Sequence, residues 1–128
     1  MIYIYTFLSL IIIDGIWLFS MGGNYKKWLG HLFAEKVSFT PVVIIYVLYT
    51  FGLVYLILTP AIKNNLSLKS IFVSALVFGL VAYGTYDLTN QSTLKDWPVF
   101  VTVIDILWGA LVTGLSCVLA MTVYKYFR

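Results

Sequence analysis

Four long apolar runs, separated by short polar segments, make up most of this chain. They cover approximately residues 2–20, 41–62, 68–89 and 98–124. A helix needs about 20 apolar residues to cross the hydrocarbon core of a bilayer, and each run is long enough for one crossing. The segments between the runs leave no room for a separate soluble domain. The pattern therefore predicts one all-α integral membrane domain, residues 1–128, built as a bundle of four transmembrane helices.

The segment between the first two runs has a pattern of its own. Met21-Gly22-Gly23 ends the first run, and residues 24–36 then place apolar side chains at helical spacing, with charged side chains on the remaining positions. We expect a short amphipathic helix that lies in the membrane interface between the first and second spans. The alternative is a loop that its aromatic residues anchor. The apolar positions are Tyr25, Trp28, Leu29, Leu32 and Phe33.

Residues that favour helix ends predict where the other helices begin. Thr40 followed by Pro41 indicates the start of the second helix, because proline is favoured at the first helical position. That helix is expected to stop near Pro60. Ser67 is expected to cap the third helix and Asp96 the fourth.

Small residues recur on one face of each of the last two helices. Gly79 belongs to a series spaced by four residues, as do Gly109 and Thr113. Small side chains let membrane helices approach each other closely. We therefore expect the third and fourth helices to pack closely through Gly79, Gly109 and Thr113.

Composition points to a membrane protein and excludes several other classes. The chain is 62% hydrophobic and 10% charged, with a mean hydropathy of +0.98, whereas soluble domains are about one quarter charged. No basic run indicates nucleic acid, so membrane lipids are the expected partners. A single cysteine, Cys117, excludes an internal disulfide. The first run contains Asp14 and lacks a basic leader and a small-residue cleavage site, so we expect it to remain as a span.

An even number of crossings places both termini on one side of the membrane. Lysines and arginines decide orientation, and acidic residues contribute little. The basic tails favour termini in the cytoplasm, although the basic residues divide equally between the two sides. The terminal side has Lys63, Lys69, Lys125 and Arg128, and the other side has Lys26, Lys27, Lys36 and Lys95.

Three aspartates lie where apolar residues are expected. With a rise of 1.5 Å per residue, Asp14 and Asp105 lie about 9–10 Å from the helix ends on the side away from the termini, and Asp87 lies about 5 Å from that side. A charge near the centre of a membrane helix costs roughly 2.5–3.5 kcal/mol. A bound cation, a water-filled pocket or protonation would reduce this cost. The structural alternative is a polar clasp between helices.

Aromatic and polar residues reach the same depth as the acids. Tyr46 and Tyr49 do so from the second helix, while Trp17 and Trp108 each follow an aspartate by three residues and so share its helical face. We predict that Asp14 and Asp105 approach each other or share a ligand, with Tyr46 or Tyr49 beside them. The candidate site comprises Asp14, Asp87, Asp105, Tyr46, Tyr49, Trp17, Trp108 and Asn90. If a metal binds, its oxygen ligands would be Asp14, Asp87 and Asp105. The sequence assigns no cofactor and no catalytic residue.

Four short motifs combine in this chain: YDLTN at 86–90, TLKDWP at 93–98, DxxWG at 105–109 and DxxWL at 14–18. This combination resembles domain-of-unknown-function family 2177, a family of small four-helix membrane proteins of bacteria. The resemblance extends over nearly the whole chain. It implies four spans and an inner-membrane location, and it implies no activity.

Three classes of function remain open. The first is a carrier for small solutes or protons that works as a homo-oligomer, similar in outline to the small multidrug resistance transporters. Acids beside aromatic rings suit cationic ligands, but carriers place their sites near the midplane. The second is an enzyme or accessory protein that acts on lipid headgroups, and the third is a non-catalytic assembly subunit. We favour a membrane protein that binds a small ligand, ion or proton, with no reaction assigned.

Overall fold

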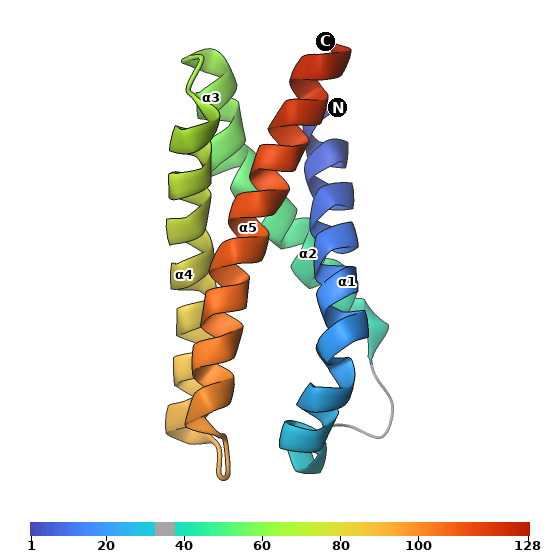
Figure 1. Ribbon diagram of the computed structural model, residues 1–128, viewed down its shortest axis with the longest axis vertical. Coiled ribbons are helices and arrows are strands. Elements are labelled where there is room, and N and C mark those ends of the chain that lie inside the picture. The colour runs from blue at the N-terminus through green and yellow to red at the C-terminus, as the bar shows by residue number, and fades with distance from the viewer. Residues whose placement is uncertain (33–37) are drawn as a thin grey trace.

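The computed structural model describes residues 1–32 and 38–128, which are almost entirely helical (Figure 1). No strand occurs in this part of the chain. Four helical stretches are long and apolar enough to cross a membrane, so the predicted all-α bundle of four spans is confirmed. The elements are α1 (Ile2–Leu29) with a 3-10 turn (Gly30–Leu32), α2 (Phe39–Leu53) with a π segment (Val54–Leu58), α3 (Thr59–Lys63), α4 (Leu68–Thr93) and α5 (Val99–Phe127).

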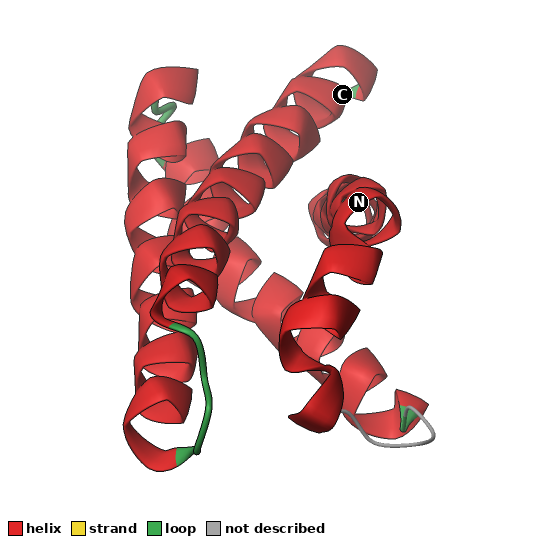
Figure 2. Ribbon diagram, turned by 60° about the horizontal axis from the view of Figure 1, so that its bottom comes forward, coloured by secondary structure: helices red, strands yellow, loops and turns green. Residues whose placement is uncertain are grey.

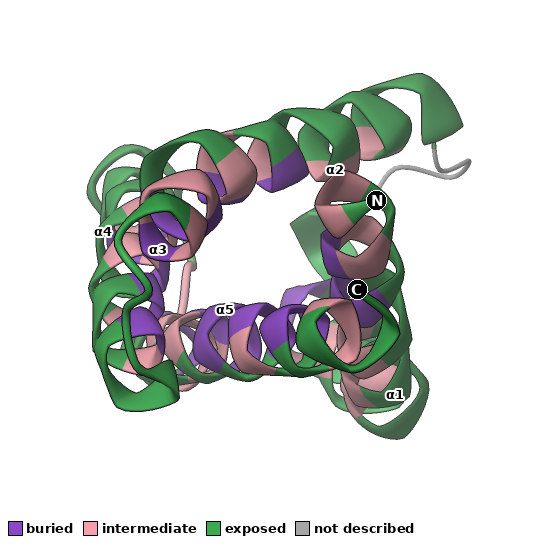
Figure 3. Ribbon diagram, turned by 90° about the horizontal axis from the view of Figure 1, so that it is seen from above, coloured by how far each residue is buried: buried purple, intermediate pink, exposed green. Residues whose placement is uncertain are grey.

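The two termini lie at the same end of the bundle, together with the turn between α3 and α4 (Figure 1). The connection between α4 and α5 lies at the opposite end. Viewed from above, buried residues face the inside of the bundle and exposed residues face outward (Figure 3). The outward residues include many large apolar side chains, such as Phe19 and Leu48. Lipid tails are the environment that suits such a surface.

The predicted helix break at Met21-Gly22-Gly23 is wrong, and residues 24–29 do not form a separate helix. α1 continues through Gly22 and Gly23 to Leu29, so Tyr25 and Trp28 belong to the first span. A glycine in a helix costs about 1 kcal/mol, whereas a helix break inside a membrane leaves backbone groups without partners. The remainder of the predicted segment, residues 33–37, lies outside the described part of the chain.

α1 is bent. Figure 2 looks along the first part of α1, and the later part leaves that axis. Helices bend at glycine pairs, and α1 contains one at Gly22-Gly23. The bend directs the later part of α1 toward α5, where Trp28 packs edge-on against Phe100 with ring centroids 5.0 Å apart.

Two of the predicted capping residues are wrong. α2 starts at Phe39 with Ser38 in the capping position, because the first turn of a helix has free N–H groups and accepts proline at several positions. α5 is preceded by Pro98, since Asp96 has a φ of 60° and cannot adopt the extended conformation of a capping residue. Ser67 does cap α4 as predicted, and its hydroxyl accepts a hydrogen bond from the Ser70 backbone at 3.1 Å.

The second span ends at Lys63, close to Pro60 as predicted, but the helix passes through the proline. The π segment Val54–Leu58 precedes it, and α3 carries the helix on to Lys63. Proline cannot donate a backbone hydrogen bond, and its ring crowds the carbonyl one turn earlier. A wider π turn before the proline relieves this crowding and lets the span continue.

Close packing of α4 on α5 confirms the predicted contact through Gly79, Gly109 and Thr113. A Cβ added to Gly79 would lie 2.5 Å from the Gly109 carbonyl oxygen and 2.6 Å from the Thr113 hydroxyl. The two backbones therefore approach as closely as glycine allows. Further along the same interface, this approach brings Asp87 of α4 beside Asp105 of α5.

Candidate functional site

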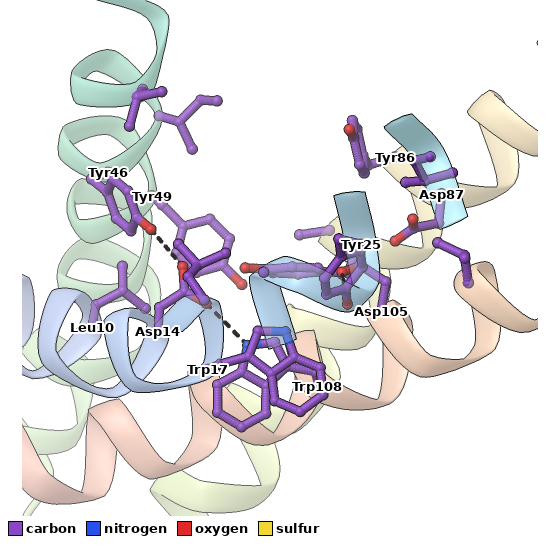
Figure 4. A pocket seen from close by; sticks show the side chains of 18 of the residues that line it. Leu10, Asp14, Trp17, Tyr25, Tyr46, Tyr49, Tyr86, Asp87, Asp105 and Trp108 are labelled. Carbon is purple, nitrogen blue, oxygen red and sulfur yellow. Dashed lines mark hydrogen bonds between the residues drawn. The ribbon is translucent and has the colours of Figure 1, made fainter. Parts of the chain in front are cut away.

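A cavity of about 710 Å³ lies among α1, α2, α4 and α5, in the half of the bundle away from the termini (Figure 4). Its walls include the three intramembrane aspartates and many aromatic rings. Among the described residues, no lysine, arginine or histidine lines it. The cavity is therefore acidic, aromatic and free of basic counter-charges from this part of the chain.

Asp14 joins three helices through its two carboxyl oxygens. The Tyr46 hydroxyl of α2 donates to Oδ2, and the Trp108 indole N–H of α5 donates to Oδ1 at 3.0 Å (Figure 4). The Trp17 ring stacks on Trp108 with centroids 4.4 Å apart and planes 8° apart. The structure thus places Tyr46 beside Asp14, as predicted. Because each carboxyl oxygen accepts a hydrogen bond from another helix, Asp14 links α1 to α2 and α5, as a polar clasp would.

Asp105 accepts a hydrogen bond from the Tyr25 hydroxyl at 3.1 Å. Tyr25 lies on the part of α1 beyond the glycine pair, so the continuation of that helix brings this donor to the cavity. Asp105 also lies one helical turn from Trp108, which bonds Asp14. Asp14 and Asp105 therefore line one cavity, and neither faces the lipid.

Asp87 is the most deeply buried of the acids, with 0% of its surface exposed. Neither of its carboxyl oxygens has a hydrogen-bond partner in the described part of the chain. Its nearest charged neighbour is the carboxyl group of Asp105 (Figure 4). A buried polar group without a partner is costly, and a buried unpaired charge more so. Asp87 is therefore the acid of the site whose bonding is least complete.

Tyr49 and Tyr83 form the inner wall of the cavity. The Tyr49 hydroxyl lies 2.6 Å from the Thr113 hydroxyl, which donates to the Gly109 carbonyl, so Tyr49 is the donor in this pair. Gly109 makes room for Tyr83, because an added Cβ would lie 2.0 Å from that ring. The rings of Tyr49 and Tyr83 meet edge to face with centroids 6.2 Å apart. Close helix packing and the aromatic wall thus depend on the same glycine.

The predicted site residues gather in this cavity with one exception. Asn90 does not line it; its backbone carbonyl accepts a hydrogen bond from Leu94 near the end of α4. The predicted residues that line the cavity are Asp14, Asp87, Asp105, Tyr46, Tyr49, Trp17 and Trp108.

Four aromatic residues of the cavity were not predicted. Tyr25 was assigned to a separate helix, yet it follows Asp14 by eleven residues, which is about three helical turns and hence the same face. Tyr83 precedes Asp87 by four residues, so its spacing was a usable signal. Tyr86 and Trp97 contact each other edge-on with centroids 6.4 Å apart, and no spacing rule links them. The four are Tyr25, Tyr83, Tyr86 and Trp97.

The structure does not bring the three conditional metal ligands, Asp14, Asp87 and Asp105, together in one group. In residues 1–32 and 38–128, no group of three histidine, cysteine, aspartate or glutamate residues lies close enough to hold a metal ion. Asp14 is directed to Tyr46 and Trp108 instead of toward Asp87 and Asp105. Equal depth along separate helices does not imply convergence, because each side chain points in the direction that its own helix face sets.

Comparison with known proteins identifies the family of this chain. A family model described as "Predicted membrane protein (DUF2177)" matches residues 1–122, which include all or most of each span. No curated protein and no solved structure matches the chain. The family description agrees with the four spans and mentions no ligand or reaction.

Proposed function

Since the chain belongs to the predicted membrane protein family DUF2177, we propose that it is a membrane protein whose cavity binds an organic cation with apolar substituents. One observation carries this proposal: an acidic, aromatic cavity of about 710 Å³ without a basic lining residue in the described part of the chain. Ligand pockets of about 300–1,000 Å³ accommodate small organic molecules. The volume therefore fits a ligand of this class.

The chemistry of the walls supports a cation with an apolar body. Ring faces of tryptophan and tyrosine attract positive charge, most strongly where water is excluded. Carboxylates add a full negative charge, which opposes anionic ligands. A bare metal ion fits less well, because the three aspartates do not converge on one point. Ammonium and phosphonium groups need no fixed coordination geometry, so acids and aromatic rings that line different parts of the cavity can bind them.

The arrangement of α2 supports entry from the bilayer. α2 crosses α1, and the second span approaches α4 mainly through the π segment (Figure 3). In the half that holds the cavity, Val42 and Ile45 of α2 and Tyr86 of α4 are lining residues, and Tyr86 is 59% exposed. An amphipathic cation dissolved in the membrane, or the ammonium headgroup of a lipid, would reach the acids along this side.

Binding of tetraphenylphosphonium to the purified protein in lipid nanodiscs tests the proposal. We expect saturable binding, detected by calorimetry and by a change in tryptophan fluorescence, since Trp17 and Trp108 line the cavity. Removing both carboxyls with Asp87→Asn/Asp105→Asn should weaken affinity by about tenfold to a hundredfold, because bonds to charged groups contribute about 1.5–3 kcal/mol.

Two controls make this experiment specific. Tetraphenylborate has the same shape and the opposite charge, and it should not bind. Asp96→Asn removes an exposed acid outside the cavity at a position of positive φ that asparagine tolerates, and it should bind as the wild type does. Absence of saturable tetraphenylphosphonium binding, or equal binding by the double variant, contradicts the proposal. Displacement by ethanolamine lipids but not by phosphatidylglycerol would identify a headgroup as the source of the cation, and displacement by soluble amines alone would identify a soluble ligand.

We further propose that the protein lies in the bacterial inner membrane with its termini in the cytoplasm, which puts the cavity in the outer half of the bilayer. Lys95→Cys and Lys63→Cys test this orientation, because both side chains are exposed and lie at opposite ends of the bundle. A membrane-impermeant maleimide added to intact cells should label only the cysteine at 95. The native Cys117 is buried and should contribute little background. Labelling only at 63 would establish the opposite orientation.

A further inference from the structure

The three acids of the cavity differ in how completely their oxygens are bonded. Asp14 has a donor on each oxygen, and Asp105 has one donor, Tyr25. Asp87 has none in the described part of the chain, although it is fully buried and lines the cavity. Asp87 and Asp105, which both have a carboxyl oxygen without a hydrogen-bond donor in the described part of the chain, thus lie beside each other on α4 and α5 (Figure 4).

We propose that Asp87 and Asp105 share one exchangeable proton and that a cation entering the cavity displaces it. The inference rests on the proposed function and adds a coupling between cation binding and proton release. It assigns different roles to the acids: Asp14 holds the helices together, while the Asp87–Asp105 pair responds to the ligand.

Packing explains why the pair needs a positive charge. The contact at Gly79 holds α4 against α5, so the two helices keep Asp87 and Asp105 close to each other. Two ionised carboxylates side by side in an apolar setting repel each other and lack solvation. A single proton between them neutralises one charge and also provides the donor that Asp87 lacks.

In the described part of the chain, no other group around the pair supplies that charge. The other titratable side chains that line the cavity come from three helices, and all of them are acids or phenols. They are Asp14 and Tyr25 on α1, Tyr46 and Tyr49 on α2, and Tyr83 and Tyr86 on α4. No basic residue in the described part of the chain lines the cavity. The choice is therefore between a proton and a cation from outside the protein.

The exchange balances in atoms and charge. As the cation approaches, the O–H bond within the pair breaks, and the proton passes to water at the cavity mouth and then to bulk buffer. The pair gains one negative charge, and the cation contributes one positive charge. The total charge in the cavity is therefore the same before and after binding, and no covalent bond to the ligand forms.

Calorimetry of tetraphenylphosphonium binding in two buffers of different ionisation enthalpy counts the protons released. We expect about one proton per cation for the wild-type protein, and an apparent affinity that rises about tenfold per pH unit while the pair carries its proton. Asp87→Asn should bind with almost no proton release and with affinity independent of pH. Its amide N–H donates to Asp105 as the shared proton does, but it cannot dissociate. Asp96→Asn should release protons as the wild type does.

The outcomes separate the two proposals. Wild-type binding without proton release overturns the exchange and leaves the proposed function standing. Proton release that persists undiminished in folded Asp87→Asn also overturns the exchange, because the proton then comes from elsewhere. Complete absence of tetraphenylphosphonium binding overturns both. If Asp87→Asn does not fold, Asp105→Asn gives the same comparison, since its amide donates to Asp87 in the reverse direction.

Discussion

Replacing Gly79 by alanine is expected to force α4 and α5 apart and to lower the free energy of unfolding by about 1–3 kcal/mol, the usual cost of overpacking. The added Cβ would lie 2.5 Å from the Gly109 carbonyl oxygen and 2.9 Å from the Ala110 Cα. Both are backbone atoms, so no side chain can rotate away to relieve the contact. Thermal unfolding of detergent-solubilised protein, followed by circular dichroism, measures the effect.

Gly15→Ala provides the matched control for this substitution. It makes the same chemical change inside a transmembrane helix, but nothing lies within 4 Å of the added Cβ. It should be neutral or slightly stabilising, because alanine favours helix by about 1 kcal/mol over glycine. Equal melting temperatures for Gly79→Ala and the wild type would show that α4 and α5 do not depend on this close approach. Weaker tetraphenylphosphonium binding by Gly79→Ala should accompany its lower stability, since the same interface positions Asp87 and Asp105.

Replacing Asp14 by alanine should have the largest effect of any cavity substitution on stability. It leaves the Tyr46 hydroxyl and the Trp108 indole N–H without their acceptor inside the bundle. Each unsatisfied buried donor costs about 1–3 kcal/mol, so we expect a loss of about 2–5 kcal/mol. Thermal unfolding in one detergent measures it, and tryptophan fluorescence reports whether the stack of Trp17 on Trp108 persists.

Two milder substitutions test whether these hydrogen bonds cause the loss. Asp14→Asn keeps one carbonyl acceptor and should be intermediate between the wild type and Asp14→Ala. Tyr46→Phe removes one donor and leaves the Trp108 bond to Asp14, so its effect should be smaller than that of Asp14→Ala. If Asp14→Ala melts at the wild-type temperature, Asp14 does not hold the three helices together and the polar clasp is excluded.

The four spans were predictable from the sequence, because a bilayer imposes a simple constraint. Backbone groups inside a membrane must bond within their own segment, so a long apolar run forms a helix whatever its neighbours are. The contact through Gly79 was predictable for a related reason, since few side chains allow two membrane helices to meet closely. Helix ends were less predictable: a φ of 60° at Asp96 depends on how the connection to α5 closes.

The depth of the acids was also predictable, but their partners were not. A constant rise per residue places Asp14, Asp105 and Tyr46 at one level without any knowledge of packing. Which indole bonds Asp14 depends on how α1 and α5 face each other: the donor is Trp108 from the other helix, while Trp17 stacks on it. The three acids likewise lie at one depth, but in the described part of the chain they do not form a group that could hold a metal ion.

Two features of the site exist only in the folded bundle. Met21-Gly22-Gly23 has the composition of a helix break, yet α1 continues through it, and only this continuation brings Tyr25 to Asp105. Asp87 ends an apolar run in a motif that is equally suited to a turn, and its burial without a donor depends on α5 closing over it. Run length and helical rise are local properties, so the order of residues determines them. Bends, side-chain partners and unpaired charges depend on groups far apart in the chain, and only their packing decides them.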